Sequence, residues 1–173
     1  MALNLEYLQR NSKVTTKKKI SFKPTKVKNL VLIDSRIDNP NVLLKGVKDD
    51  YDYVLVGNND DLISIISNNI SEDFTYNLSF VCHGEPGRLI IGSDVIDSNF
   101  VIDNQNIFNN IYIENIYLFS CFVGKDRNFI DTLSDITNSQ IFFSTSKVGH
   151  TSRNGSWQLE AFNKNLNAKN NIV

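Results

Sequence analysis

Hydrophobic positions along this chain gather in short runs of four to six residues, separated by polar segments that carry turn-forming residues. Runs of this length are typical of strands buried in a sheet. We therefore expect five strands, at Leu30–Ile33, Tyr51–Val56, Asn77–Cys82, Ile116–Ser120 and Gln140–Ser144.

Apolar residues recur at helical spacing between several of these runs. Asp60 is a suitable N-cap for a helix over Asp61–Ile70, and Asp126 or Asn128 for the helix after the fourth strand. A shorter helix is expected around Val42–Val47. Strands that alternate with helices predict βαβ units, and hence an α/β fold with a mainly parallel central sheet.

Further segments complete the pattern. The EPG turn at residues 85–87 precedes a small β-hairpin over residues 88–96, and a polar crossover with helical character covers residues 98–113. Residues 157–160 are expected to form a short last strand, and residues 20–22 another ahead of the first.

These elements divide the chain into three parts. Residues 1–28 are expected to be a flexible, lysine-rich leader, residues 29–161 one α/β domain, and residues 162–173 a polar, Asn- and Lys-rich tail or linker. A chain of 173 residues fits a single domain.

Charge narrows the classes of partner. Residues 11–28 hold seven lysines and no acid, although the net charge of the chain is only −1. We interpret this stretch as solvated leader and predict no nucleic-acid partner. The sequence shows neither a membrane-spanning stretch nor a secretory signal, so we expect a cytoplasmic protein, or one exported by a non-classical, type I-like route as part of a larger protein.

Cysteine content and short motifs limit the cofactors and ligands that the chain is expected to bind. Two cysteines make no disulfide framework, and the sequence has neither a zinc-ligand pattern nor a glycine-rich phosphate loop. We expect no metal and no other cofactor, and the absence of a phosphate loop argues against a nucleotide-binding domain.

Two residues carry a candidate chemistry. His83 follows the third apolar run and Cys121 follows the fourth. If these strands are parallel neighbours, both residues lie where α/β sheets bind their ligands. A thiol attacks a carbonyl as the thiolate, so a nucleophilic cysteine needs a nearby imidazole or helix N-terminus. His83 is a candidate for the first, and the helix that follows Cys121 for the second.

The amides of Gly84 and Cys121 are candidates for an oxyanion hole, because Gly84 has no side chain to obstruct a substrate. Structural roles are the competing interpretation, since cysteine is often a core residue and a strand-end histidine often only a hydrogen-bonding one. We interpret Cys82 as such a core residue and His150 as a surface residue.

Four segments of the sequence resemble one known family. LVLIDSR at 30–36, FVCHGEPGRLIIG at 80–92, IYLFSCFVG at 116–124 and STSKVGHTSRNGSWQLE at 144–160 are similar, in this order, to bacterial domain of unknown function 4347, which is related to the clan CD caspase-like cysteine peptidases. That domain commonly stands at the amino terminus of large, repeat-rich exported proteins. The resemblance covers residues 29–161 and implies a caspase-like three-layer α/β/α sandwich of about five to six strands.

The resemblance also implies roles for single residues. His83 matches the histidine that acts as general base, and Cys121 matches the nucleophile. Gly84 matches the glycine whose amide polarises the scissile carbonyl. Trp157 matches a tryptophan of a GxW segment, where packing and binding are both open.

Candidates for contact with the substrate are Asp34, Arg36, Ser120 and Trp157. Asp34 would favour a basic residue before the scissile bond and Arg36 an acidic one. A turn cap and a surface ion pair are the structural alternatives for these two.

The leading hypothesis is a caspase-like cysteine peptidase with a Cys–His dyad. Its partner would be a peptide or protein substrate, its own chain or a larger parent protein included. The alternative is a non-catalytic caspase-like domain with a role in interaction or export. The sequence carries no signal for an oligomeric state.

Overall fold

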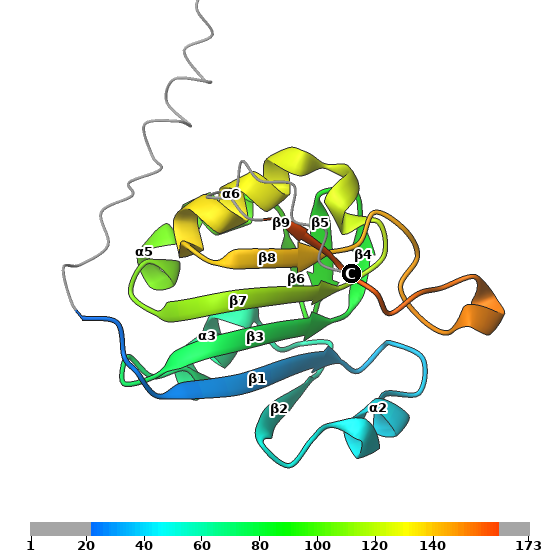
Figure 1. Ribbon diagram of the computed structural model, residues 1–173, viewed down its shortest axis with the longest axis horizontal. Coiled ribbons are helices and arrows are strands. Elements are labelled where there is room, and N and C mark those ends of the chain that lie inside the picture. Colours follow the sequence, from blue (N-terminus) through cyan, green and yellow to red (C-terminus); the bar gives the residue numbers. More distant parts are fainter. Residues whose placement is uncertain (1–21, 163–173) are drawn as a thin grey trace, which may run out of the picture.

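A six-stranded sheet runs through the centre of the molecule, as Figure 1 shows. The computed structural model describes residues 22–162. In spatial order the strands are β2 (Tyr51–Val56), β1 (Val27–Asp34), β3 (Thr75–Val81), β7 (Tyr112–Phe119), β8 (Gln140–Phe143) and β9 (Glu160–Phe162). Neighbouring strands are parallel from β2 to β8, and β9 is antiparallel to β8. The carboxyl ends of the five parallel strands therefore lie at one edge of the sheet.

Helices connect the strands, and a second small sheet follows β3. The helices are α2 (Pro40–Gly46), α3 (Leu62–Asn69), α4 (Ser98–Asp103), α5 (Gln105–Phe108) and α6 (Arg127–Thr137), with 3-10 turns η1 (Val123–Lys125) and η2 (Thr151–Arg153). The small antiparallel sheet consists of β4 (His83–Glu85), β5 (Arg88–Ile91) and β6 (Asp94–Ile96). No helix within the described residues has the length and apolar character needed to cross a membrane.

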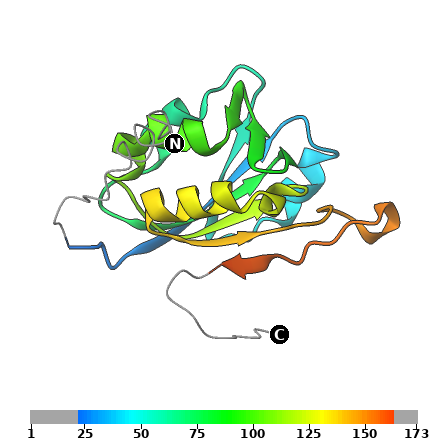
Figure 2. The ribbon, with the colours of Figure 1, turned by 90° about the horizontal axis from the view of Figure 1, so that it is seen from above.

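One face of the central sheet forms the core. Leu32, Phe80 and Leu118 lie in register across β1, β3 and β7, and all three are buried. Because side chains alternate between the two faces of a strand, every second residue of these strands points to the same side. Buried residues of α3, α4, α5 and α6 pack against this face, and Figure 2 shows these helices on one side of the sheet.

The opposite face carries polar and aromatic residues. Asn77 donates a side-chain hydrogen bond to Asn29 (3.0 Å) and accepts one from Asn115 (2.8 Å), so amide groups bridge three strands. The rings of Tyr117 and Phe142 stack, with centroids 4.7 Å apart. α2 lies beside this face near the carboxyl ends of the strands, where it lines a cavity together with the ends of β3 and β7.

The predicted fold class is confirmed: the molecule has an α/β fold with a mainly parallel sheet flanked by helices, consistent with a caspase-like sandwich. The five predicted strands, the hairpin and the helical crossover are present. Strands β3 and β7 begin two and four residues earlier than the apolar runs predict, at Thr75 and Tyr112. The missed residues alternate between the polar face and the core, so they form no continuous apolar run.

Three local predictions need correction. Asp61, not Asp60, caps α3, since its carboxylate accepts the Ser64 amide at 2.8 Å, whereas that of Asp60 accepts the Gly57 amide. Trp157 precedes the last strand, which starts at Glu160. Phe22 lies in no strand and is fully exposed, while residues 20 and 21 lie outside the described residues.

Candidate active site

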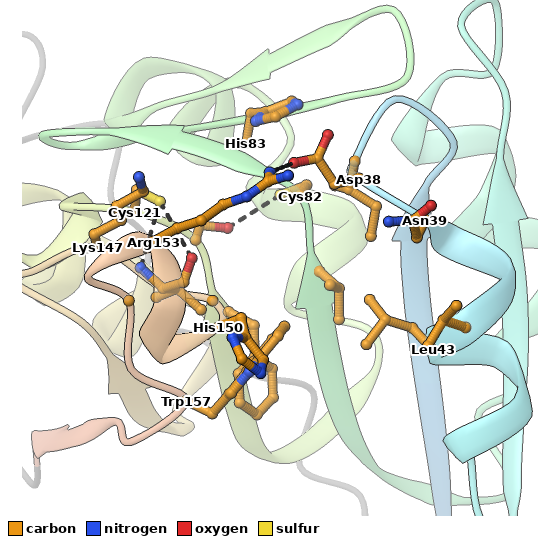
Figure 3. Close-up of a pocket in the computed structure, with 18 of the residues that line it drawn as sticks. Asp38, Asn39, Leu43, Cys82, His83, Cys121, Lys147, His150, Arg153 and Trp157 are labelled. Carbon is orange, nitrogen blue, oxygen red and sulfur yellow. Dashed lines mark hydrogen bonds and ion pairs between the residues drawn. The ribbon is translucent and has the colours of Figure 1, made fainter.

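A cavity of about 560 Å³ opens at the carboxyl ends of β3 and β7. One wall is formed by the segment after β1 and by α2, and the other by the loop of residues 147–157, which follows β8. His83 and Cys121 both line it, as Figure 3 shows. The topology thus brings the predicted base and the predicted nucleophile to one cavity.

The two cysteines of the chain differ in exposure, because side chains alternate between the two faces of a strand. Cys82 and Ser120 follow the core positions of their strands, and both side chains are buried, with Cys82 Sγ 3.2 Å from Ser120 Oγ. Burial raises the pKa of the Cys82 thiol to about 12, although the hydrogen bond between Cys82 and Ser120 acts in the opposite direction. Cys121, the next residue along, is partly exposed at the cavity. The interpretation of Cys82 as a core residue agrees with this geometry.

The His83 ring is held by a backbone carbonyl. Its Nε2 lies 3.3 Å from the carbonyl oxygen of Arg36. A carbonyl oxygen can only accept, so Nε2 carries the proton in this contact and the lone pair of the neutral imidazole resides on Nδ1.

Asp34 and Arg36 hold that carbonyl in place. The fully buried Asp34 carboxylate accepts two bonds from the Arg36 guanidinium, at 2.9 and 2.7 Å, and one from the Arg36 amide at 2.8 Å. The Gly92 amide donates a further bond to Asp34 at 2.8 Å. Burial disfavours the Asp34 carboxylate, but the bonds from Arg36 and Gly92 outweigh it and lower the pKa of Asp34.

Three hydrogen bonds join the segment 121–124 to the chain that follows β8. The Val148 amide donates to Cys121 Sγ at 3.4 Å, the Phe122 amide donates to Ser146 O at 2.9 Å, and the Gly124 amide to Ser144 O at 3.0 Å. Phe122 adopts a left-handed conformation, with φ of 59°. This conformation is costly for a bulky residue, and it occurs directly after the candidate nucleophile.

Gly84 lies against the backbone of Cys121. A Cβ atom at Gly84 would stand 2.7 Å from Ser120 Cβ and 3.3 Å from the Cys121 amide nitrogen. Any side chain here would push the two segments apart. The absence of a side chain therefore lets the predicted oxyanion-hole residues approach each other.

An ion pair spans the cavity. Arg153, at the tip of the 147–157 loop, binds Asp38, which follows β1 on the other wall. In Figure 3 the Arg153 side chain reaches toward Asp38 between Cys121 and His83. Among the contacts of the described residues, no hydrogen bond joins the His83 ring to Cys121.

A family model described as "Domain of unknown function (DUF4347)" matches residues 30–172, most of the chain. The chain belongs to the DUF4347 family. This confirms the family named by the resemblance, and the family description assigns no activity. No curated protein and no solved structure matches the chain significantly.

Of the other residues predicted for the site, two line the cavity and two do not. Trp157 lines the cavity with its ring 6.2 Å from that of Phe119. Ser120 contributes to the wall, but its hydroxyl points to Cys82. Asp34 and Arg36 bind each other outside the cavity lining, so we expect neither to select a charged substrate side chain.

His150 is exposed, as expected of a surface residue, and it also lines the cavity, where its Nδ1 accepts the Ser152 amide at 3.1 Å as the cap of η2. The expectation about the helix that follows Cys121 changes. The N-terminus of α6 is capped by Asp126, whose carboxylate accepts the Asn128 amide at 3.0 Å. A carboxylate already meets this helix end, so the helix adds little positive potential for Cys121.

Sequence reasoning missed four parts of the site: the Arg36 carbonyl, the Val148 amide, Asp38 and Arg153. The first two are backbone groups, which have no signature in a sequence. Asp38 and Arg153 each lie in a polar loop, where charged residues are common. Within residues 22–162, no three His, Cys, Asp or Glu side chains come together as a metal site would require.

Proposed function

We propose that this domain is a caspase-like cysteine peptidase, with Cys121 as nucleophile and His83 as general base. The observation that carries the proposal is the shared cavity, in which the His83 ring is held by a backbone carbonyl through Nε2. That contact leaves Nδ1 to accept a proton, as a general base must.

The proposed reaction uses few groups. His83 Nδ1 takes the thiol proton of Cys121, and the thiolate attacks the scissile carbonyl carbon. The imidazolium then gives its proton to the departing amine, which leaves a thioester on Cys121. Water, deprotonated by the same imidazole, hydrolyses the thioester and restores the thiol.

Backbone amides would stabilise the charged species. The Val148 amide, 3.4 Å from Cys121 Sγ, favours the thiolate because a hydrogen bond to the charged form stabilises it. The amides of Gly84 and Cys121 would bind the oxyanion of the tetrahedral intermediate. The close approach of Gly84 to the Cys121 backbone supports this pairing.

One observation favours the alternative, a non-catalytic interaction or export-associated domain. His83 and Cys121 are not hydrogen-bonded to each other, and the Arg153–Asp38 ion pair crosses the space near them. A peptidase needs a substrate, or a movement of the 147–157 loop, to bring the dyad together.

Thiol reactivity separates the two functions. We would incubate the wild type with iodoacetamide from pH 5 to 9 and follow labelling by intact mass, with Cys121→Ala to assign the site. For a peptidase, Cys121 is labelled rapidly below pH 7, and His83→Ala slows this labelling by at least about tenfold.

Two internal controls sharpen the test. His150→Ala removes the other histidine of the cavity and should leave labelling unchanged. Cys82 should stay unlabelled while the protein is folded, because burial raises its pKa to about 12. Labelling of Cys121 only near pH 8.5, with no effect of His83→Ala, would favour the interaction domain.

A further inference from the structure

Some of the apolar side chains that line the cavity of the candidate nucleophile are unusually exposed. Val42 on α2 is 67% exposed and Trp157 is 47% exposed, and both line the cavity. Phe122, next to Cys121, is also exposed but is not part of the cavity lining. Residues this apolar are normally buried, so their gathering at one cavity marks a surface that contacts a ligand.

Several apolar side chains line the cavity. Leu43 and Trp157 lie on its opposite sides in Figure 3. Val81 and Phe119, at the ends of β3 and β7, also line it, and the Phe119 ring contacts that of Trp157. This arrangement offers contact to a large side chain from several directions.

Charged groups near the cavity are mostly neutralised. Asp38 and Arg153 bind each other, and Lys147 is the remaining charged side chain of the lining. A basic substrate side chain would have to compete with Arg153 for Asp38, and an acidic one would have to bind Lys147 or compete with Asp38 for Arg153. An apolar side chain needs no charged partner and can contact the apolar part of the lining directly.

We infer that the cavity selects a large apolar residue, such as leucine or phenylalanine, immediately before the scissile bond. This inference rests on the proposed peptidase function and names its substrate class. Val42, Leu43 and Trp157 are the residues that set the preference, because they form the two walls that such a side chain would contact.

The test uses peptidyl acyloxymethyl ketones: the active-site thiolate of a cysteine peptidase attacks the methylene carbon beside the ketone, displaces the carboxylate and forms a stable thioether. The probes differ only in the residue beside the ketone: leucine, phenylalanine, alanine, aspartate or arginine. The rate of Cys121 modification by the leucine or phenylalanine probe should exceed that of the others by at least about tenfold. Trp157→Ala and Val42→Ser should each lower the leucine rate about three- to tenfold.

A matched control is Val95→Ser, which alters another exposed valine, 47% exposed on β6, outside the cavity. Its rates should equal those of the wild type. Faster reaction with the aspartate or arginine probe, or equal rates for all probes, would overturn the apolar preference while the peptidase function stands. If iodoacetamide labels Cys121 but no peptide probe does, the peptidase function fails, and this inference fails with it.

Discussion

Gly84 shows how a missing side chain can define a site. In Gly84→Ala the new methyl group would stand 2.7 Å from Ser120 Cβ and 3.0 Å from the Cys121 carbonyl oxygen. We expect the backbone to shift, at a cost of about 1–3 kcal/mol in stability. The shift would move the Gly84 amide, which Ala keeps, away from the oxyanion and should lower kcat/KM by about 100-fold or more, measured with a leucine peptide substrate.

Gly46→Ala is the matched control for this prediction. Nothing lies within 4 Å of a Cβ atom at Gly46, at the end of α2. Its stability and activity should therefore stay close to those of the wild type. An active Gly84→Ala variant would remove Gly84 from the oxyanion hole.

Asp34 is expected to stabilise the fold in a pH-dependent way. Its folded-state pKa is lowered, so its contribution is present above the unfolded-state pKa of about 3.9 and is lost as the pH falls through the folded value. Asp34→Asn should cost about 2 kcal/mol or more at pH 7, because the buried position loses its ion pair with Arg36.

Urea unfolding of wild type and Asp34→Asn between pH 7 and 3 measures this effect. The difference between the two should shrink below about pH 4. Asp38→Asn, at an exposed carboxylate, provides the comparison. A difference that stays constant down to pH 3 would contradict the assignment of the stabilisation to the ionised Asp34.

At the scale of elements, the 147–157 loop is joined to the opposite wall by one exposed ion pair. The side chains of Arg153 and Asp38 are 66% and 75% exposed. Exposed pairs contribute about 0–1 kcal/mol, so the loop is held weakly at this point. Such a contact can open and close with little cost, as a substrate cavity requires.

A double-mutant cycle tests this weak closure. Arg153→Ala, Asp38→Ala and the double variant should each change the unfolding free energy by less than about 1 kcal/mol, with a coupling energy in the same range. High salt should reduce the coupling further. A coupling of about 3 kcal/mol would identify the pair as a structural anchor of the loop instead.

For the whole molecule, the proposed peptidase predicts processing of its own chain. The lysine-rich segment 11–28 ends in the first two residues of β1, and the part of it before β1 is a candidate cleavage region. On incubation the wild-type protein should become shorter, whereas Cys121→Ala keeps its full mass. Intact-mass spectrometry reads the result, and the same mass for both proteins would argue against self-processing.

Much of the fold could be predicted from the sequence because it depends on periodicity. The run Asn77–Cys82 predicts a buried strand, and Asp126 marks the start of α6. The errors fall where periodicity is weak. Trp157 lies in an apolar-containing segment, but hydrogen bonds of the 147–157 loop, such as Gly149 amide to Ser156 O, occupy that chain instead of the sheet.

The candidate site divides in the same way. His83, Cys121 and Gly84 could be chosen from the sequence because each follows an apolar run, and their side chains, or the lack of one, have a known chemistry. Asp34 and Arg36 have an equally suggestive chemistry, yet they bind each other away from the cavity. From the sequence alone, the position of Asp34 and Arg36 at the end of a strand does not indicate which groups their side chains will contact.

The sequence by itself determined the α/β class, the succession of strands along the chain, the family and the residue types that could perform catalysis, because these follow from local pattern and side-chain chemistry. Only the tertiary structure decided which groups meet: the Arg36 carbonyl at His83, the Val148 amide at Cys121, and the apolar walls of α2 and the 147–157 loop. These contacts join segments far apart in the chain, and several use backbone atoms that every residue has. No local pattern can encode them.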